Sequence, residues 1–288
     1  MTALARLSKP HYIYRPSQLI RRMFLGSGAE ALVQTPWGCP VLVSREDAIG
    51  AGIARTGVHE LAVSETMWRL AGGDELALDV GANIGYFTGL LARRARAVIA
   101  LEPNPQLHRF IAGNIERWDV ADSITLDTRA ASDAAGTAEL HLPIGYDSNH
   151  GVATLEASED TRSYEVPTVR LDDVIAGRTV GVMKLDVEGH ELPALTGAAQ
   201  SLAEHRIRDI IFEDHEPHPS AVSRLLESAG FTISRIEESL TRPLLVAPAR
   251  PARGWDAPTY LATRDPARAS RLLGARGWSC LRSRSARS

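Results

Sequence analysis

The sequence has few cysteines and no long apolar run. Its only two cysteines, Cys39 and Cys280, lie far apart in a chain of 288 residues. This spacing excludes a disulfide framework and a cysteine-based metal site, and it is typical of a reducing compartment. No segment approaches the roughly 20 apolar residues that a membrane-spanning helix needs. Residues 1–18 also lack the apolar core of a secretory signal. We therefore expect a cytoplasmic protein that does not insert into a membrane.

Lysine is scarce, and there is no excess of positive charge. Of the 32 lysine and arginine residues, only Lys9 and Lys184 are lysine, which we attribute to the base composition of the genome. The formal net charge is −3, and only the segment after residue 265 is notably basic. Nucleic-acid binding generally needs a basic face, so we expect no nucleic-acid partner. The sequence predicts no particular oligomeric state.

Strands and helices alternate from residue 76 onward. Apolar runs rich in β-branched residues predict seven strands, at 76–80, 97–103, 123–132, 180–189, 207–216, 231–238 and 259–264. Segments with helical spacing lie between most of them. This alternation is typical of an α/β fold with a Rossmann-like, mostly parallel seven-stranded sheet that has helices on both faces.

The alternation of strands and helices is interrupted once, and other segments precede and follow it. Short alternating segments within about 136–170 predict a small antiparallel insertion, and its polar Asn149 and His150 are possible acceptor contacts. We divide the chain into an N-terminal arm and helical or β-hairpin extension at 1–70, a Rossmann-like domain at 71–265 and a basic, flexible tail at 266–288. The arm includes a predicted helical stretch at 17–26.

A glycine turn follows the first strand of the alternating region. Its pattern is Asp79-x-Gly81-x-Asn83-x-Gly85. A dinucleotide fingerprint requires a glycine where Asn83 stands, and a phosphate-binding P-loop requires a lysine that is missing. The pattern looks like the first motif of class I S-adenosylmethionine-dependent methyltransferases. Gly81 would let the backbone approach the methionine end, and Asp79 would orient its ammonium group.

An acidic residue ends the next strand. Glu102 lies 23 residues after Asp79, which suits a carboxylate that accepts hydrogen bonds from both ribose hydroxyls of an adenosine. Because the glycine turn and Glu102 follow two successive predicted strands at the expected spacing, we prefer a cofactor site to a simple helix cap at Asp79.

Several stretches in the same order and spacing resemble the FkbM family of methyltransferases. They are LDVGANIGYFT, ALEPNP, AASDAAGTAEL, VPTVRLDDVI, MKLDVEGHELPALTGA and IIFEDHE. The resemblance implies a class I fold, S-adenosylmethionine as donor and a hydroxyl acceptor, often on a sugar or polyketide. It places Asp79, Gly81, Asn83 and Gly85 at the cofactor and Glu102 at the ribose. It also places Asn104, Ala131 and Ser132 near the adenine, and Asp186 beside the methyl group.

Polar side chains follow two further strands. Asp186, Glu188 and His190 come after one, and Glu213, Asp214 and His215 after the next. The carboxyl ends of such strands are where ligands bind. An alcohol acceptor must lose its proton, so we predict His215, and second His190, as the base. A carboxylate base, Glu188 or Glu213, is the alternative.

A metal site is a second alternative for the same cluster. Asp186 with Glu213 or Asp214 offers hard oxygen ligands for a divalent cation, although we do not favour a metal. The predicted function is methyl transfer from S-adenosylmethionine to a hydroxyl of a small metabolite, such as a sugar or a glycosylated or polyketide product. A nicotinamide-dependent oxidoreductase and a non-catalytic binding protein remain alternatives.

Overall fold

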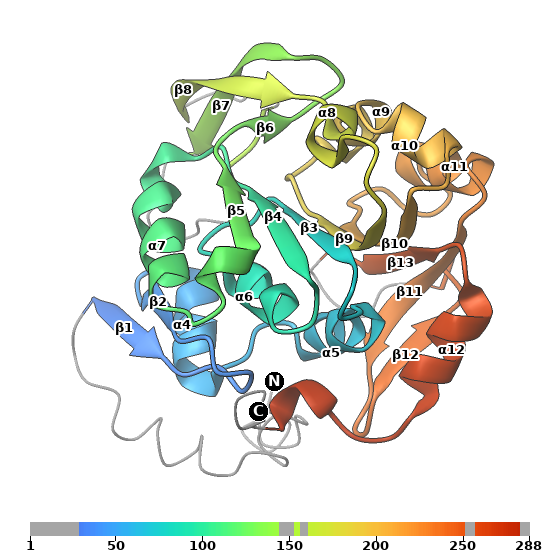
Figure 1. Cartoon of the computed structure of the whole chain (residues 1–288), viewed down its shortest axis with the longest axis horizontal. Helices are drawn as coiled ribbons and strands as arrows, with labels where there is room; N and C mark the ends of the chain where they lie inside the picture. The colour runs from blue at the N-terminus through green and yellow to red at the C-terminus, as the bar shows by residue number, and fades with distance from the viewer. Residues whose placement is uncertain (1–28, 144–152, 156–160, 251–256, 283–288) are drawn as a thin grey trace.

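The computed structural model describes residues 29–143, 153–155, 161–250 and 257–282 (Figure 1). The helical stretch predicted at 17–26, and Asn149 and His150, lie outside these residues.

One large sheet organises the molecule (Figure 1). Its strand order is β12-β11-β13-β10-β9-β3-β4-β5. The strands are β3 (Leu76–Val80), β4 (Ala97–Leu101), β5 (Ile124–Asp127), β9 (Val180–Leu185), β10 (Ile207–Glu213), β11 (Thr232–Glu238), β12 (Pro243–Val246) and β13 (Thr259–Thr263). β5, β4, β3, β9 and β10 run parallel, whereas β13 pairs antiparallel with both β10 and β11. The predicted Rossmann-like fold is confirmed.

The sheet has one strand more than the seven that the sequence predicts. The additional strand, β12, is a four-residue edge strand that begins at a proline and pairs with β11 alone. An edge strand tolerates proline, and four residues give little alternation, so the sequence signal is weak.

Helices cover both faces of the sheet because its central strands are buried on both sides. Every residue of β3 and of β9 is buried. One apolar cluster joins the first face to the helices α5 (Leu61–Leu70), α6 (Tyr86–Ala92) and α7 (Pro105–Glu116). A second cluster joins the other face to α8 (Leu171–Ile175), α9 (Glu191–Thr196), α10 (Ala199–Ala203) and α11 (Ala221–Ser228). A short 3₁₀ turn, η1 (Ala121–Ser123), precedes β5.

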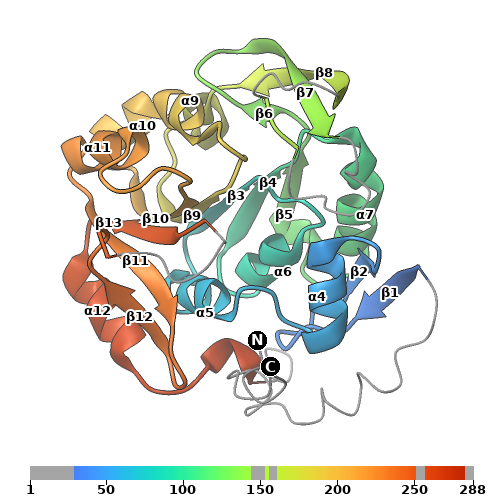
Figure 2. The same ribbon diagram turned by 180° about the vertical axis from the view of Figure 1, so that it is seen from behind.

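A three-stranded sheet forms the insertion, as expected. β7 (Gly136–Pro143) pairs antiparallel with β8 (Thr161–Val169), and β8 pairs parallel with the two-residue strand β6 (Ala130–Ala131). This small sheet stands beyond α7 and α8, at one edge of the molecule (Figures 1 and 2).

The N-terminal extension packs on the first face of the large sheet. It consists of a hairpin of β1 (Glu30–Val33) and β2 (Val41–Ser44), then α4 (Ala48–Thr56) and α5. This hairpin and these helices lie within the helical or β-hairpin extension predicted at 1–70. The helix α4 begins at Asp47, whose side chain accepts a hydrogen bond from the Gly50 amide at 2.6 Å.

The prediction of a flexible tail is wrong for residues 266–282. They form α12 (Pro266–Gly274) and the 3₁₀ turn η4 (Ser279–Leu281), and Trp278 and Cys280 are fully buried. Glu65 of α5 explains this order: its carboxylate accepts hydrogen bonds from the backbone amides of Ser279 at 2.6 Å and Cys280 at 2.7 Å. Glu65 therefore has a structural role.

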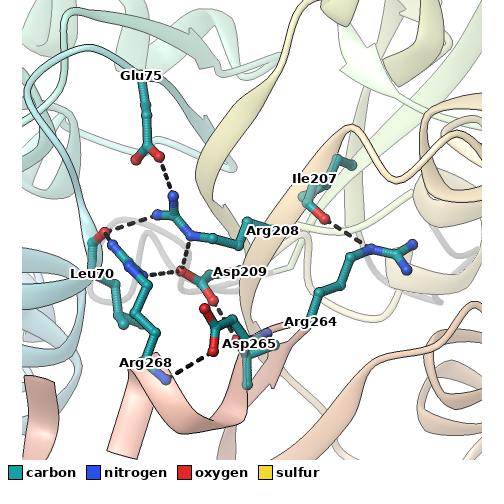
Figure 3. Close-up of polar contacts among 9 residues, drawn as sticks. Leu70, Glu75, Ile207, Arg208, Asp209, Arg264, Asp265 and Arg268 are labelled. Atoms are coloured by element: carbon teal, nitrogen blue, oxygen red, sulfur yellow. Dashed lines mark hydrogen bonds and ion pairs between the residues drawn. The ribbon is translucent and has the colours of Figure 1, made fainter. Parts of the chain in front are cut away.

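A buried polar network also holds the C-terminal segment in place (Figure 3). Asp209 of β10 is fully buried, and its carboxylate contacts Arg208 at 2.9 Å, Arg268 of α12 at 3.1 Å and Thr263 at 2.6 Å. Arg208 and Arg268 both donate to the carbonyl of Leu70, at 3.0 and 2.7 Å. The network thus joins the C-terminal end of α5 to β10, β13 and α12.

We expect Asp209→Asn to destabilise the fold, because it leaves two arginines without their buried counter-charge. The free energy of unfolding should fall by about 3–5 kcal/mol, the usual cost of breaking a buried ion pair from one side. Urea unfolding measures it. Glu204→Gln, which breaks an ion pair at the surface, is the control and should leave stability nearly unchanged. Equal stability of the two variants would contradict the role of Asp209.

Candidate active site

A cleft of about 930 Å³, its open mouth included, lies along the carboxyl ends of β3, β4 and β9. Its polar wall is formed by the glycine turn, Glu102, Lys184, Asp186 and Glu188. Its apolar wall includes Ile49, Phe87, Leu101, Leu107, Ala130, Ala131, Leu140, Ala153, Leu155 and Val187. The N-terminal extension, the large sheet and the insertion all contribute to this lining.

The glycine turn holds a conformation that few residues adopt. Gly81, Asn83 and Gly85 have φ angles of +83°, +52° and +85°. A Cβ atom on Gly81 would lie 1.8 Å from the carbonyl oxygen of Asp186. Glycine is therefore required where the turn after β3 touches the loop after β9. A larger residue at Gly81 would disturb the fold before it tested ligand binding.

Asp79 lies beneath the turn, and it is not among the residues that line the cleft. It is fully buried, and the Thr88 hydroxyl donates to its Oδ2 at 2.6 Å. Its Oδ1 has no hydrogen-bond partner among the described residues. Burial raises the pKa of Asp79 to about 6, although Lys184 opposes this shift. The site therefore retains one unused carboxylate oxygen close to the turn.

Glu102 lines the cleft in a fixed orientation. The backbone amides of Asn83 and Asn104 donate to its Oε2 and Oε1 at 2.7 and 2.9 Å. Burial raises the pKa of Glu102 to about 7, whereas these two hydrogen bonds lower it. Each oxygen keeps a lone pair for a further donor, as the predicted ribose contact requires.

The structure separates the residues predicted near the adenine. Ala131 lines the cleft. Asn104 and Ser132 do not: the Asn104 side chain caps α7 by accepting from the Gln106 amide at 3.0 Å, and the Ser132 hydroxyl bonds to Nε2 of His190 at 3.0 Å. Among the described contacts, Asn104 bears on the cleft through the hydrogen bond of its backbone amide to Glu102.

Lys184 is a site residue that the sequence analysis missed. Its side chain is 5% exposed and lines the cleft, with Nζ 2.6 Å from Oδ2 of Asp186 and 4.9 Å from the centre of the Phe87 ring. Burial disfavours its charge, but Asp186 and Asp79 outweigh that effect and hold its pKa above the ordinary value. A signal existed, because one of only two lysines in an arginine-rich chain lies inside the KLDVEG motif.

Two carboxyl groups next to Lys184 hold their protons unusually strongly. Burial, with the nearby charge of Asp186, raises the pKa of Glu188 and of Glu213 to about 8. Glu188 lines the cleft, in a left-handed conformation with φ +53°. Glu213 lines a smaller neighbouring cleft of about 190 Å³, which shares Lys184 and Asp186 with the first.

Neither histidine predicted as the base lies in either cleft. His215 is exposed in the loop after β10. It lies there because Asp214 turns inward, where it accepts hydrogen bonds from the Ser220 hydroxyl and the Glu216 amide. His190 starts α9 and bonds to Ser132. The histidine that does line the first cleft is His59, from the N-terminal extension.

The alternative metal ligands are only partly brought together. Asp186 and Glu213 both line the smaller cleft, but Asp186 is paired with Lys184, and Asp214 is bonded to Ser220. Across the described ranges, no three His, Cys, Asp or Glu side chains are arranged to hold a metal ion.

Comparison with known proteins assigns the chain to a family. The model of the methyltransferase FkbM domain matches residues 79–237. The hexuronic acid methyltransferase AglP of Haloferax volcanii is 30% identical over 160 residues, which cover 54% of this chain and 63% of AglP. The AMB antimetabolite synthetase AmbE of Pseudomonas aeruginosa is 26% identical over 213 residues, 58% of this chain and 10% of AmbE. This chain therefore spans less than two thirds of either relative.

Solved structures resemble the chain more distantly. A methyltransferase FkbM from Methylobacillus flagellatus has a TM-score of 0.45 and 16% identity, over 73% of this chain and 52% of that one. SMU.1697c from Streptococcus mutans, a putative methyltransferase solved in complex with SAH, has a TM-score of 0.44 and 9% identity, over 70% of this chain and 95% of that one.

The fold and the cleft are those of a methyltransferase-like α/β domain. By the match of its residues 79–237, the chain belongs to the FkbM methyltransferase family. Among the residues that the structure covers, no helix has both the length and the apolar character needed to cross a membrane.

The raised carboxyl pKa values predict how stability depends on pH. Between pH 4.5 and 8 the folded chain keeps protons on Glu188 and Glu213 that the unfolded chain releases. Since the folded state then binds more protons, its stability should fall as the pH rises through this window. Urea unfolding at pH 5.5, 7 and 8.5 tests this.

Glu188→Gln/Glu213→Gln should flatten this dependence between pH 7 and 8.5, because glutamine carries no titrating proton, whereas Asp79 and Glu102 still contribute a slope below pH 7. Glu116→Gln, exposed on α7, is the control and should keep the whole slope. A wild-type stability that rises with pH, or a slope above pH 7 that the double variant retains, would contradict the assignment.

Proposed function

We propose that this chain transfers a methyl group from S-adenosylmethionine to a hydroxyl group of a small sugar-like acceptor. The observation that carries the proposal is the cleft itself. One cleft joins the glycine turn, an oriented carboxylate at Glu102 and a cluster of charged groups around Lys184. Family membership supports methyl transfer, and the hexuronic acid named for AglP supports a sugar as acceptor.

The residues present fit S-adenosylmethionine. Glu102 offers both carboxylate oxygens to a ribose diol, and the apolar wall with Leu107, Ala130 and Ala131 suits an adenine ring. Asp79 retains a buried oxygen beside the turn for an ammonium group, reached directly or through water. The backbone of Gly81–Ile84 lines the cleft and would contact the methionine end.

The bound cofactor would supply an activated methyl group on a sulfonium, so the protein mainly has to align the acceptor and remove its proton. Glu188 is the best-placed base. It lines the same cleft as Glu102, and its raised pKa of about 8 makes it a stronger proton acceptor than an ordinary carboxylate. Lys184, paired with Asp186, provides the positive charge that partly balances these groups.

Cofactor binding can be tested without an acceptor. We expect the full chain to bind S-adenosylhomocysteine and not NAD in calorimetric titrations. Glu102→Gln should weaken this binding about 10-fold or more, because a charged hydrogen-bond acceptor for the ribose is lost. Glu116→Gln is the control. Tight NAD binding, or full affinity in Glu102→Gln, would contradict the proposal.

The base can be tested against the histidine that the sequence favoured. With labelled S-adenosylmethionine and a sugar acceptor, Glu188→Gln should lower kcat by about 10²–10⁴-fold while affinity for S-adenosylhomocysteine holds. The wild-type rate should rise with pH up to about 8, as Glu188 loses its proton. His215→Gln should turn over normally. The reverse result, a slow His215→Gln and a normal Glu188→Gln, would restore the histidine as base.

A further inference from the structure

Two adjacent residues of the N-terminal extension reach the two clefts. His59 lines the larger cleft, and Glu60 lines the smaller one. Both precede residue 79, where the match to the family domain begins. They therefore lie outside the stretch that the family domain matches, at the side of the site where Lys184 and Asp186 are shared between the clefts.

The chain fixes the backbone of this pair rigidly. The buried Tyr86 hydroxyl of α6 accepts a hydrogen bond from the His59 amide at 2.8 Å and lies 3.1 Å from the His59 carbonyl oxygen, to which it donates. Glu60 itself has φ +42°, a left-handed conformation that non-glycine residues seldom adopt. Backbone strain of this kind persists where the surrounding structure enforces it.

The His59 imidazole is held among aromatic rings. Its ring centre lies 5.9 Å from that of Tyr86 and 6.2 Å from that of Phe87. The Lys184 ammonium group also lies near Phe87, 4.9 Å from the ring centre. His59 and Lys184 therefore approach the same part of the larger cleft, next to Asp186.

Carboxyl groups outnumber cationic groups around these residues. Glu60, Asp186, Glu188 and Glu213 line the clefts on this side, against the single ammonium group of Lys184, which Asp186 already pairs. Glu60 acts electrostatically on both Lys184 and Glu213, whose pKa values it raises. Among the residues described as lining the two clefts, none is an arginine, although arginine is the dominant basic residue of the chain.

An acidic acceptor fits this environment poorly. A carboxylate or phosphate on the acceptor would lie against several carboxyl groups, with no arginine to form the bidentate contact that such anions usually receive. An ammonium group would instead be attracted, because opposite charges at close range stabilise each other.

Resting on the proposed function, we infer that His59 and Glu60 select the acceptor, and that this acceptor is a hydroxylated amine such as an amino sugar. Its ammonium group binds between Glu60 and Glu213. The hydroxyl to be methylated lies at Glu188, and His59 hydrogen-bonds a neighbouring hydroxyl. The proton of the methylated hydroxyl passes to Glu188 as the oxygen–methyl bond forms and the sulfur–methyl bond breaks.

Three methyl glycosides that differ mainly in charge test this inference. They are methyl glucosaminide, methyl glucoside and methyl glucuronide, each incubated with the full chain and labelled S-adenosylmethionine. We expect kcat/KM to fall in that order. Glu60→Gln should raise the KM for the glucosaminide about 10-fold, leave the KM for the glucoside nearly unchanged and leave S-adenosylhomocysteine affinity unchanged. Added salt should raise the wild-type KM for the glucosaminide alone.

Charge reversal sharpens the test. Glu60→Arg should shift the preference toward the glucuronide, whereas Glu46→Arg, at a site away from both clefts, should not. His59→Gln should raise KM for all three glycosides with little effect on cofactor affinity, and His59→Ala should raise it further.

The outcomes separate the inference from the proposed function. A wild-type preference for the glucuronide, or a preference that Glu60→Arg leaves unchanged, would overturn the inference while methyl transfer stands. No labelled product from any glycoside, and none from a small-molecule extract of the source cells, would overturn the proposed function and the inference with it. If the labelled product formed from the extract is retained on cation-exchange resin, it is positively charged and supports the inference. If it is retained on anion-exchange resin, it is negatively charged and contradicts the inference.

Discussion

The ammonium group of Lys184 is the electrostatic centre on which the carboxyl edge of the sheet depends. β9 pairs in parallel with β3, and this register sets Lys184 opposite Asp79 and two residues before Asp186. Its 2.6 Å contact with Asp186 allows several carboxyl groups to share a largely buried space. Burial raises the pKa of Glu188 and of Glu213, and the charge of Lys184 partly offsets this shift. The position of one lysine in one strand thus moderates the electrostatics of both clefts.

Local signals in the sequence were sufficient for the parallel part of the sheet and for the positions of the glycine turn and Glu102 at one cleft. The turn from Asp79 to Gly85 and the acid at Glu102 depend on residues close to two strand ends, and strand order brings these ends together. The close approach of Gly81 to the Asp186 carbonyl could not be predicted, because it joins loops more than a hundred residues apart. Likewise, a Cβ at Gly197, between α9 and α10, would meet the Ser132 carbonyl at 2.0 Å, a contact between distant segments that the sequence does not reveal.

The acceptor side was harder to predict because it depends on which way loops turn. His215 and Glu213 are two residues apart, yet the inward bond of Asp214 to Ser220 turns the chain so that only Glu213 reaches a cleft. His59 lacked any sequence motif, and Tyr86 holds its backbone from 27 residues further along the chain. The scarcity of lysine was attributed to genome composition, which hid the one lysine that the site uses.

The helix α5 has a consequence for how such enzymes are recombined. Its first turn follows the segment that carries His59 and Glu60. The Leu70 carbonyl at its far end accepts hydrogen bonds from Arg208 and Arg268, and Glu65 accepts one from the backbone of the C-terminal segment. Segments before and after the family domain therefore form one structural unit. A chimaera that exchanges residues 29–70 between relatives would carry new residues at positions 59 and 60. It would lack the matching C-terminal segment, which packs against α5. Such an exchange should work only when residues 257–282 are transferred with it.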